Sequence, residues 1–188
     1  MLANRFEDAL AYAAELHTEQ TRKGSGVPYI SHLMAVTALV LEDGGSEDEA
    51  IAALLHDAVE DQGGKPTLQE IRTRFGEAVA DIVLACSDAF THPKPPWRER
   101  KKAHIEHMRQ ATPEARRVIL ADKLHNARSL LRDLRMEGNK TWKKFAGSQS
   151  GTLWYYRAAL KALDDGKGSY LAEELERVLA QIGKLANE

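Results

Sequence analysis

The stretch LLHDAVED, residues 54–61, brings one imidazole and three carboxylates together directly after an apolar lead-in. Residues four apart lie on the same face of a helix, so a helix here would place His56 above Glu60 and Asp57 above Asp61. Such groups can bind a divalent cation and can exchange protons with a water molecule. Taken alone, the stretch is equally typical of an amphipathic helix with a solvated acidic face.

Two further residues, His32 and Asp122, lie in helical patterns that could turn them toward the same place. With His56 and Asp57 they make a set of two imidazoles and two carboxylates, which suits a borderline-to-hard divalent cation with water at its open positions. Manganese or ferrous iron fits this set better than zinc in a closed tetrahedral site, and manganese is the expected cofactor ahead of ferrous iron and zinc. Because His56 and Asp57 are adjacent, their helix must present about 100° of its circumference to the ion.

Glu60 and Asp61 follow one helical turn after these candidate ligands. A cation lowers the pKa of a water molecule that it holds, and a nearby carboxylate can then orient or deprotonate that water. The two residues are therefore the candidate general acid/base groups, although acidic side chains on a helix surface are common without any such role.

Basic residues could bind an anionic substrate at two places in the sequence. Arg22 and Lys23 precede Gly24-Ser25-Gly26, where the glycines allow close approach of the backbone and a guanidinium can pair with phosphate or lie on a base. A solvated basic loop is the alternative interpretation. A second cationic and aromatic cluster lies late in the chain and consists of Lys143, Lys144, Trp154, Tyr155 and Arg157.

The segment ADKLHNARSL, residues 121–130, lies in the longest predicted helix. Asn126 follows Asp122 by four residues, so both lie on one face, away from the leucines. An amide there could contact a sugar or nucleobase, or could orient the aspartate. His125 is close to them on the helix and is interpreted as a neighbour of the site or as incidental.

Almost every segment shows helical rather than alternating periodicity, and the sequence predicts an all-α bundle. Ser46 with Glu49 predicts a capping box, as do Asn4 with Glu7 and Thr67 with Glu70, while Thr112 with Pro113 predicts the start of the longest helix. The predicted helices lie near residues 4–17, 31–43, 47–62, 68–75, 79–86, 98–110, 113–137, 152–163 and 170–185. The proline-containing segment 88–98 is the one long predicted loop.

Composition indicates an ordinary globular protein of one domain. The 188 residues are 43% hydrophobic and 29% charged, with a formal net charge of −2, so nothing general predicts binding to nucleic acid. The single cysteine, Cys86, excludes an intramolecular disulfide and a cysteine-based zinc site. No signal peptide or membrane span is predicted, so a cytoplasmic location is the expectation.

Three segments, RKGSGVPYISH (22–32), AALLHDAVED (52–61) and ADKLHNARSL (121–130), resemble in order and spacing the hydrolase domain of the RelA/SpoT group. That group lies within the HD superfamily of metal-dependent phosphohydrolases. The resemblance implies an HD-domain helical bundle as a single domain over residues 1–188, with a core at about 3–163 and a C-terminal helix at 169–186. The chain is too short for the further domains of the long enzymes, so it resembles a stand-alone small alarmone hydrolase.

The resemblance also implies an activity, namely removal of the 3′-pyrophosphate of (p)ppGpp to give GDP or GTP and pyrophosphate. In it, manganese would be held by His32, His56, Asp57 and Asp122. Water would be activated by Glu60 and Asp61. The nucleotide would be bound by Arg22, Lys23, Asn126 and Lys144.

Two alternatives remain open at this point. One is an HD phosphohydrolase for another nucleotide, either an NADPH phosphatase or a deoxynucleotidase, and the other is a non-catalytic nucleotide-binding module. The first is motivated by the segment SDAFTHPKPPWRERKK after Cys86, which differs from the long enzymes. A second departure is Leu33, where the family usually has proline. The sequence is compatible with a homo-oligomer but does not predict one.

Overall fold

The computed structural model describes residues 2–87, 95–164, 166 and 168–186. These residues form α-helices and one 3₁₀ helix, with no strand among them and a single isolated β-bridge between Thr21 and Pro28. The all-α prediction is confirmed. The helices are α1 (Asn4–Leu16), α2 (Ile30–Glu42), α3 (Glu47–Leu55), α4 (Ala58–Gln62), α5 (Lys65–Phe75), α6 (Glu77–Cys86), α7 (Trp97–Arg109), α8 (Pro113–Glu137), η1 (Gly138–Lys144), α9 (Ser148–Leu163) and α10 (Tyr170–Ala186).

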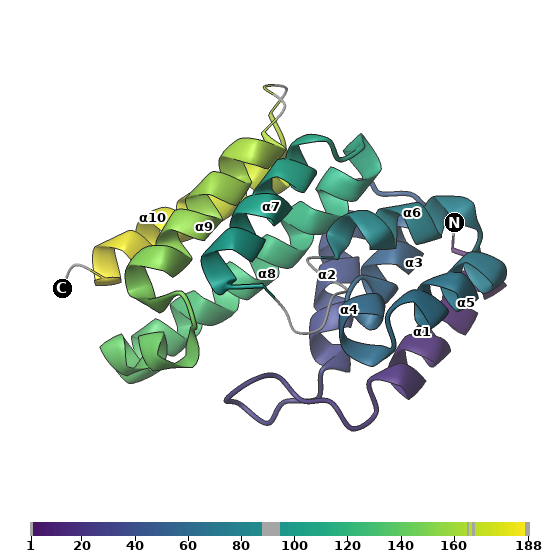
Figure 1. Ribbon diagram of the computed structural model, residues 1–188, viewed down its shortest axis with the longest axis horizontal. Coiled ribbons are helices and arrows are strands. Elements are labelled where there is room, and N and C mark those ends of the chain that lie inside the picture. Colours follow the sequence, from purple (N-terminus) through teal and green to yellow (C-terminus); the bar gives the residue numbers. More distant parts are fainter. Residues whose placement is uncertain (1, 88–94, 165, 167, 187–188) are drawn as a thin grey trace.

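Helix α8 is the element against which the others are arranged (Figure 1). Helices α1 to α6 gather at one end of it, while α7, α9 and α10 lie toward the other end. Direct packing of α8 against α2, α3, α6, α9 and α10 joins the two groups into one bundle. Among the described residues, no helix is both long and apolar enough to cross a membrane.

The sequence explains why α8 begins and faces as it does. Thr112 caps it by accepting a hydrogen bond from the Ala115 amide, and Pro113 occupies its first turn, as predicted. Its buried face is apolar apart from one residue, Asp122, which is only 8% exposed. The helix therefore carries a carboxylate into the interior between Leu120 and Leu124.

A partly buried ion-pair network joins α8 to the turn between α2 and α3. Ser46 and Glu49 form the predicted capping box at the start of α3. The Glu49 side chain is buried and also pairs with the Arg117 guanidinium of α8, which in turn pairs with Asp43 at 2.9 Å. The network holds the start of α3 against α8.

The prediction of one continuous helix through HDAVED is wrong. Helix α3 ends at Leu55 and α4 begins at Ala58, so His56 and Asp57 form the junction between two helices. Neighbouring side chains on a continuous helix diverge by about 100°. His56 and Asp57 keep backbone dihedral angles in the helical region, and their side chains nevertheless meet, with His56 Nε2 3.0 Å from Asp57 Oδ2.

Two predicted caps are also wrong. Helix α1 begins at Asn4 with Ala3 at the N-cap position, where no side chain accepts a hydrogen bond. Helix α5 begins at Lys65 with Pro66 in its first turn, which places Thr67 inside the helix. In both cases the helix starts earlier than the capping pattern indicated.

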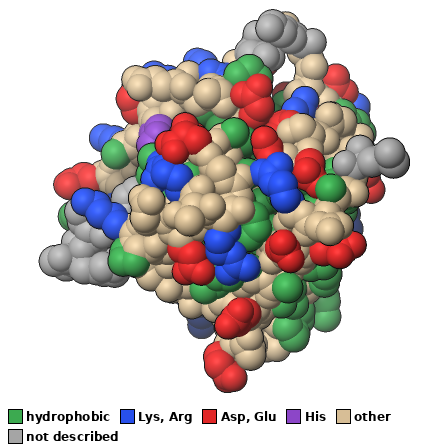
Figure 2. Space-filling view, turned by 90° about the vertical axis from the view of Figure 1, so that its right-hand side faces the viewer, with side chains coloured by type: hydrophobic (Ala, Val, Ile, Leu, Met, Phe, Trp, Pro, Cys, Tyr) green, Lys and Arg blue, Asp and Glu red, His purple; other side chains and the backbone are tan. Residues whose placement is uncertain are grey.

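One face of the molecule, seen in Figure 2, lies at the end that carries α1 and α5. Acidic and basic side chains are intermixed on it. This face therefore presents no extended surface of one charge.

Replacing Leu124 by alanine should destabilise the bundle. The side chain is fully buried on α8, two residues after Asp122. A buried leucine truncated to alanine loses about 2–5 kcal/mol through lost transfer energy and the cavity left behind. Urea denaturation measures this loss. Leu41→Ala on α2, where the leucine is 36% exposed, is the matched control and should change stability by about 0.5 kcal/mol or less. Equal losses in the two variants would contradict the assigned core.

Candidate functional site

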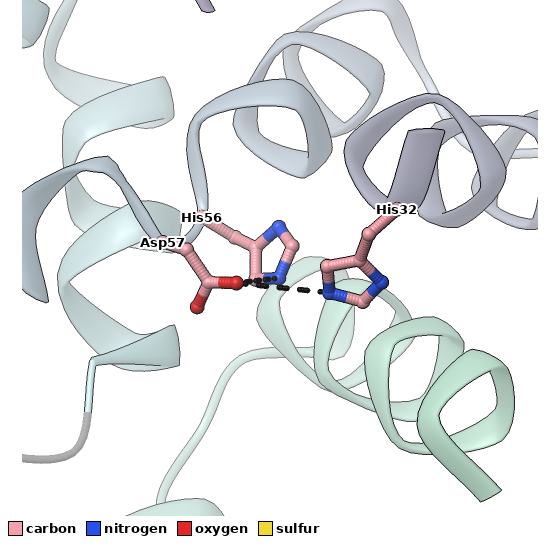
Figure 3. Close-up of side chains that lie close together, drawn as sticks. All are labelled: His32, His56 and Asp57. Carbon is pink, nitrogen blue, oxygen red and sulfur yellow. Dashed lines mark ion pairs between the residues drawn. The ribbon is translucent and has the colours of Figure 1, made fainter. Parts of the chain in front are cut away.

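Three parts of the chain bring imidazoles and carboxylates to one buried point. His32 comes from α2, His56 and Asp57 from the α3–α4 junction, and Asp122 from α8. The Nε2 atom of His32 lies 3.2 Å from Asp122 Oδ1 and 3.6 Å from Asp57 Oδ2. The Nε2 atom of His56 lies 3.0 Å from Asp57 Oδ2 and 3.6 Å from Asp122 Oδ1. Both rings point their Nε2 atoms toward the Asp57 carboxylate (Figure 3).

The chemistry of this set fits a divalent cation. The ligand atoms of His32, His56 and Asp57 all lie within 4.8 Å of one another. The Nε2 atoms of both histidines are buried and lack a hydrogen-bond partner of acceptable geometry. The His56 Nδ1 atom lies 2.8 Å from the Ala53 carbonyl oxygen, which can only accept, so Nδ1 carries the proton and a neutral ring leaves Nε2 as a lone pair. Two such lone pairs beside two carboxylates are the ligands that borderline divalent ions bind.

Both carboxylates are held in the charged form. Burial raises the pKa of Asp57, but a protonated His56 and the close approach of both imidazoles outweigh it, so the pKa lies well below its usual range. A divalent cation in place of the His56 Nε2 proton would lower the pKa of Asp57 in the same direction. Burial likewise raises the pKa of Asp122. The charge of Lys123 and the two histidines lower it by more, so the pKa of Asp122 also lies well below its usual range. The site therefore presents two anionic ligands at neutral pH.

Tyr29 contacts the site and was not singled out by the sequence analysis. Its hydroxyl donates a hydrogen bond of 2.6 Å to Asp57 Oδ2, and its ring stacks on His17 with centroids 5.3 Å apart. Burial, followed by the Asp57 charge, raises the pKa of Tyr29, which keeps the hydroxyl protonated as a donor. The available signal was its position three residues before His32, one turn away at the start of α2.

Lys123 was also missed, and it shares Asp122 with Asn126. The Lys123 ammonium lies 2.6 Å from Asp122 Oδ2, and the Asn126 amide donates to Asp122 Oδ1. The Asn126 carbonyl accepts a hydrogen bond of 2.6 Å from Arg22. Asn126 thus orients Asp122, one of the two roles that the sequence left open, and also joins it to the basic loop.

Glu60 and Asp61 lie on α4, beyond the junction that carries His56 and Asp57. Gln20 donates a hydrogen bond of 2.8 Å to Asp61 Oδ2. Desolvation of the Asp61 carboxyl, with the negative charge of Asp57 nearby, raises its pKa above the usual value, although the Gln20 hydrogen bond works in the opposite direction. A raised pKa brings a carboxylate closer to the range useful for proton transfer.

A cavity of about 510 Å³ adjoins this cluster and collects the predicted nucleotide-binding residues. Arg22, Lys23, Asn126 and Lys144 all line it, with aromatic side chains among the other lining residues. Helix α7 contributes Arg100 and Lys101, and Arg132 of α8 completes a lining of six cations against one acid, Asp133. The cavity is therefore suited to a polyanion that also has an aromatic part.

Lys144 contributes less free charge than the sequence suggested. Its ammonium lies 2.9 Å from a Glu137 oxygen and 3.4 Å from an Asp133 oxygen. Its stem packs against Gly24, which has a φ of +81° and where a Cβ would come within 3.4 Å of the Lys144 chain. Lys144 thereby supports the basic loop as well as lining the cavity.

The late cationic and aromatic cluster divides between two places. Trp154 and Arg157 line a separate open hollow of about 750 Å³ on α9, which contains none of the predicted site residues.

The predicted loop at 88–98 falls largely on residues 88–94, which lie outside the described residues. Leu33, the departure after His32, is fully buried in the core.

Comparison with known proteins agrees with this geometry. The model of the HD domain family matches residues 9–152. The chain is 42% identical over 128 residues to the guanosine-3′,5′-bis(diphosphate) 3′-pyrophosphohydrolase MESH1 of Xenopus tropicalis, a match that covers 66% of this chain and 69% of that protein. The MESH1 of Drosophila melanogaster is 31% identical over 186 residues, 96% of each chain.

A solved structure shows the same fold. It is described as "a metazoan ortholog of SpoT" that "hydrolyzes ppGpp and plays a role in starvation responses". It superposes with a TM-score of 0.80 at 27% identity, over 97% of this chain and 98% of its own. With a family match across most of its length and a relative aligned almost end to end, the chain belongs to the HD domain family.

Proposed function

We propose that this chain is a metal-dependent 3′-pyrophosphohydrolase of guanosine-3′,5′-bis(diphosphate), giving GDP and pyrophosphate, with GTP as the product from the 5′-triphosphate form. The observation that carries the proposal is the junction of the His/Asp cluster with a cavity lined by six cations. A guanine nucleotide with two diphosphates has the charge and the aromatic part that this cavity suits. The relatives that match the chain carry this activity in their names.

His32, His56, Asp57 and Asp122 would hold the cation, which we propose to be manganese. Two imidazoles and two carboxylates leave positions open for water and a phosphate oxygen, which suits manganese better than a closed zinc site. When bound, such an ion supplies Lewis acidity toward a phosphoryl oxygen and lowers the pKa of water. Ferrous iron and zinc remain the alternatives to compare in metal titrations.

The chain's own residues would carry the proton and hold the substrate. Hydrolysis consumes one water molecule, whose oxygen bonds to the phosphorus nearest the ribose as the bond from that phosphorus to the 3′-oxygen breaks. Asp61 or Glu60 takes the proton of the attacking water and passes it to the departing 3′-oxygen, which leaves as the hydroxyl. Arg22 and Lys23 neutralise phosphate charge from the basic loop.

Arg22 has a second contact that fits nucleotide binding. Its guanidinium carbon lies 5.6 Å from the centroid of the Tyr29 ring while it also donates to Asn126. A guanidinium held by a ring contact and a hydrogen bond is pre-organised to contact a base or a diphosphate. Asn126 and Lys144 line the same cavity and would complete the nucleotide contacts.

Binding of manganese alone should stabilise the protein through Asp57. A ligand at 100 times its Kd adds about 2.7 kcal/mol to the free energy of unfolding, which raises Tm by about 5–10 °C for a chain of this size. Asp57→Ala should lose this rise because it removes an anionic ligand. Asp81→Ala on α6, where the side chain is 63% exposed, is the matched control and should keep it. Thermal unfolding with and without manganese decides, and an unchanged rise in Asp57→Ala would exclude the proposed ligand set.

Release of pyrophosphate from ppGpp by the purified protein tests the reaction itself. Release is expected with manganese and should stop with excess chelator. NADPH and deoxynucleoside triphosphates are assayed in parallel under the same conditions. Turnover of one of these without turnover of ppGpp would move the substrate while keeping the metal site, and nucleotide binding without any turnover would favour a binding module.

Glu60→Ala should separate metal binding from turnover. Loss of a general acid/base group lowers kcat by about 10²–10⁴-fold, while the four proposed ligands stay in place. The variant should therefore keep the manganese-dependent rise in Tm. Glu106→Ala on α7, where the glutamate is 62% exposed, is the control and should keep both properties. Full activity in Glu60→Ala would show that Glu60 has no such role.

The pH dependence should report on Asp61 through Gln20. Asp61 acts as a base only when ionised, so kcat/KM falls as the pH drops through its raised pKa. Gln20 favours the ionised form by donating to it, so Gln20→Leu should raise the pKa further and move the acid limb to higher pH. Gln69→Leu on the exposed side of α5 is the control. An acid limb that stays in place in Gln20→Leu would argue against Asp61 as the base.

A further inference from the structure

The two imidazoles of the metal cluster are anchored differently. His56 is held by its own backbone, because its Nδ1 atom donates 2.8 Å to the Ala53 carbonyl one turn earlier. His32 is held by another side chain, with its Nδ1 atom 2.7 Å from Nδ1 of His125 on α8. The orientation of one ring is therefore built into the α3 backbone, while that of the other depends on a residue 93 positions away.

No other group can easily replace His125 in this contact. His32 is fully buried, so water does not reach it from the surface. Its remaining ring neighbours are Tyr29 and His56, which meet it edge-to-face at 73° and 71° and offer no hydrogen bond. Within the described part of the chain, His125 is the one side chain within hydrogen-bond distance of the His32 Nδ1 atom, while Nε2 faces the carboxylates of Asp57 and Asp122.

A bound cation would fix the protons of both rings. His32 can offer a lone pair at Nε2 only if the proton of the neutral ring is on Nδ1. That Nδ1–H then donates to His125 Nδ1, which must itself lack a proton. His125 therefore carries its own proton on Nε2, and each ring is restricted to one tautomer.

We propose that His125 is a positioning residue of the metal centre, which accepts the Nδ1–H of His32 and so fixes the tautomer and the orientation of that ligand. The inference rests on the metal site of the proposed function but not on the identity of the nucleotide. Metal-binding histidines usually direct their second nitrogen to a carboxylate, a backbone carbonyl or water, as His56 does here. His125 takes the place of such an acceptor for His32.

His125 also lies at the boundary between the two halves of the site. It follows Asp122 on α8 by three residues and lines the 510 Å³ cavity next to Asn126. Its ring centroid is 4.8 Å from that of His32. His125 thus contacts a proposed metal ligand and is itself part of the wall of the proposed nucleotide cavity.

The test compares the affinity for manganese of four variants and the wild type. His125→Leu and His125→Ala remove the acceptor, and loss of such a partner typically weakens metal binding by about 10–100-fold. His125→Asn keeps an acceptor, because its amide oxygen lies close to where Nδ1 was, and should bind within a few-fold of wild type. His107→Leu, at an exposed histidine of α7, is the matched control and should not change the affinity.

Calorimetric titration with manganese gives the affinities, and the visible absorption spectrum of the cobalt-loaded protein reports on the ligand geometry. The spectrum should change in His125→Leu and return in His125→Asn. Turnover of His125→Leu should need about 10–100-fold more manganese for half-saturation than that of wild type.

The proposal is overturned if folded His125→Leu and His125→Ala bind manganese as tightly as wild type. It is also overturned if kcat collapses at saturating metal while the affinity is unchanged, because His125 would then act on the substrate instead. If His125→Leu fails to fold, His125→Ala and His125→Asn still decide. Failure of the wild type to bind manganese would instead contradict the metal site of the proposed function.

Discussion

Two carboxylates directed at one point in the interior are the constraint that the rest of this structure satisfies. Burying an uncompensated carboxylate is costly, so Asp57 and Asp122 require positive charge or hydrogen-bond donors around them. Two imidazoles and the Lys123 ammonium meet part of that need. A divalent cation at the same point would meet it more fully, because it faces both carboxylates at once. The cluster is costly as structure alone and well suited as a metal site.

This demand explains features of the fold that would otherwise look unfavourable. Helix α8 carries Asp122 within its buried face, where an apolar residue would pack at lower cost. A turn at His56 and Asp57 interrupts the helix between α3 and α4. The ion pairs of Arg117 with Asp43 and Glu49 hold α8 against the α2–α3 turn. They lie a few residues before Asp122 on α8 and before the turn at the end of α3. Where α2, the α3–α4 junction and α8 converge, the structure is therefore less stable locally than apolar packing and an unbroken helix would make it.

The metal cluster and the cavity share their side chains. Asp57 accepts from Tyr29, whose ring lies beneath Arg22, and Asp122 accepts from Asn126, which in turn accepts from Arg22. Arg22 is therefore linked to both carboxylates through one intermediate side chain each. A phosphate that draws Arg22 toward it would alter the hydrogen bonds on both proposed anionic ligands. Nucleotide binding and metal binding are for this reason expected to be coupled rather than independent.

Much of the fold followed from local signals, whereas the decisive break did not. Thr112-Pro113 and the Ser46–Glu49 box act within one turn, so the sequence alone places the starts of α8 and α3. Residues 54–61 contain no glycine or proline, so no strong helix-breaking residue marks the turn at His56 and Asp57. At this turn Asp57 lies beside His32 of α2, and His56 lies beside Asp122 of α8, and no local pattern encodes such contacts between helices.

The same division applies within the site. His32, His56, Asp57 and Asp122 could be proposed together because a shared motif order links them, and the structure places all four at one point. The Tyr29 hydrogen bond crosses 28 positions to Asp57, and no periodicity connects residues at that separation. The contact between His32 and His125 crosses 93 positions. Groups that bind the ion could be recognised by type, whereas groups that only orient them are defined by contacts between helices, and those appear once the bundle is assembled.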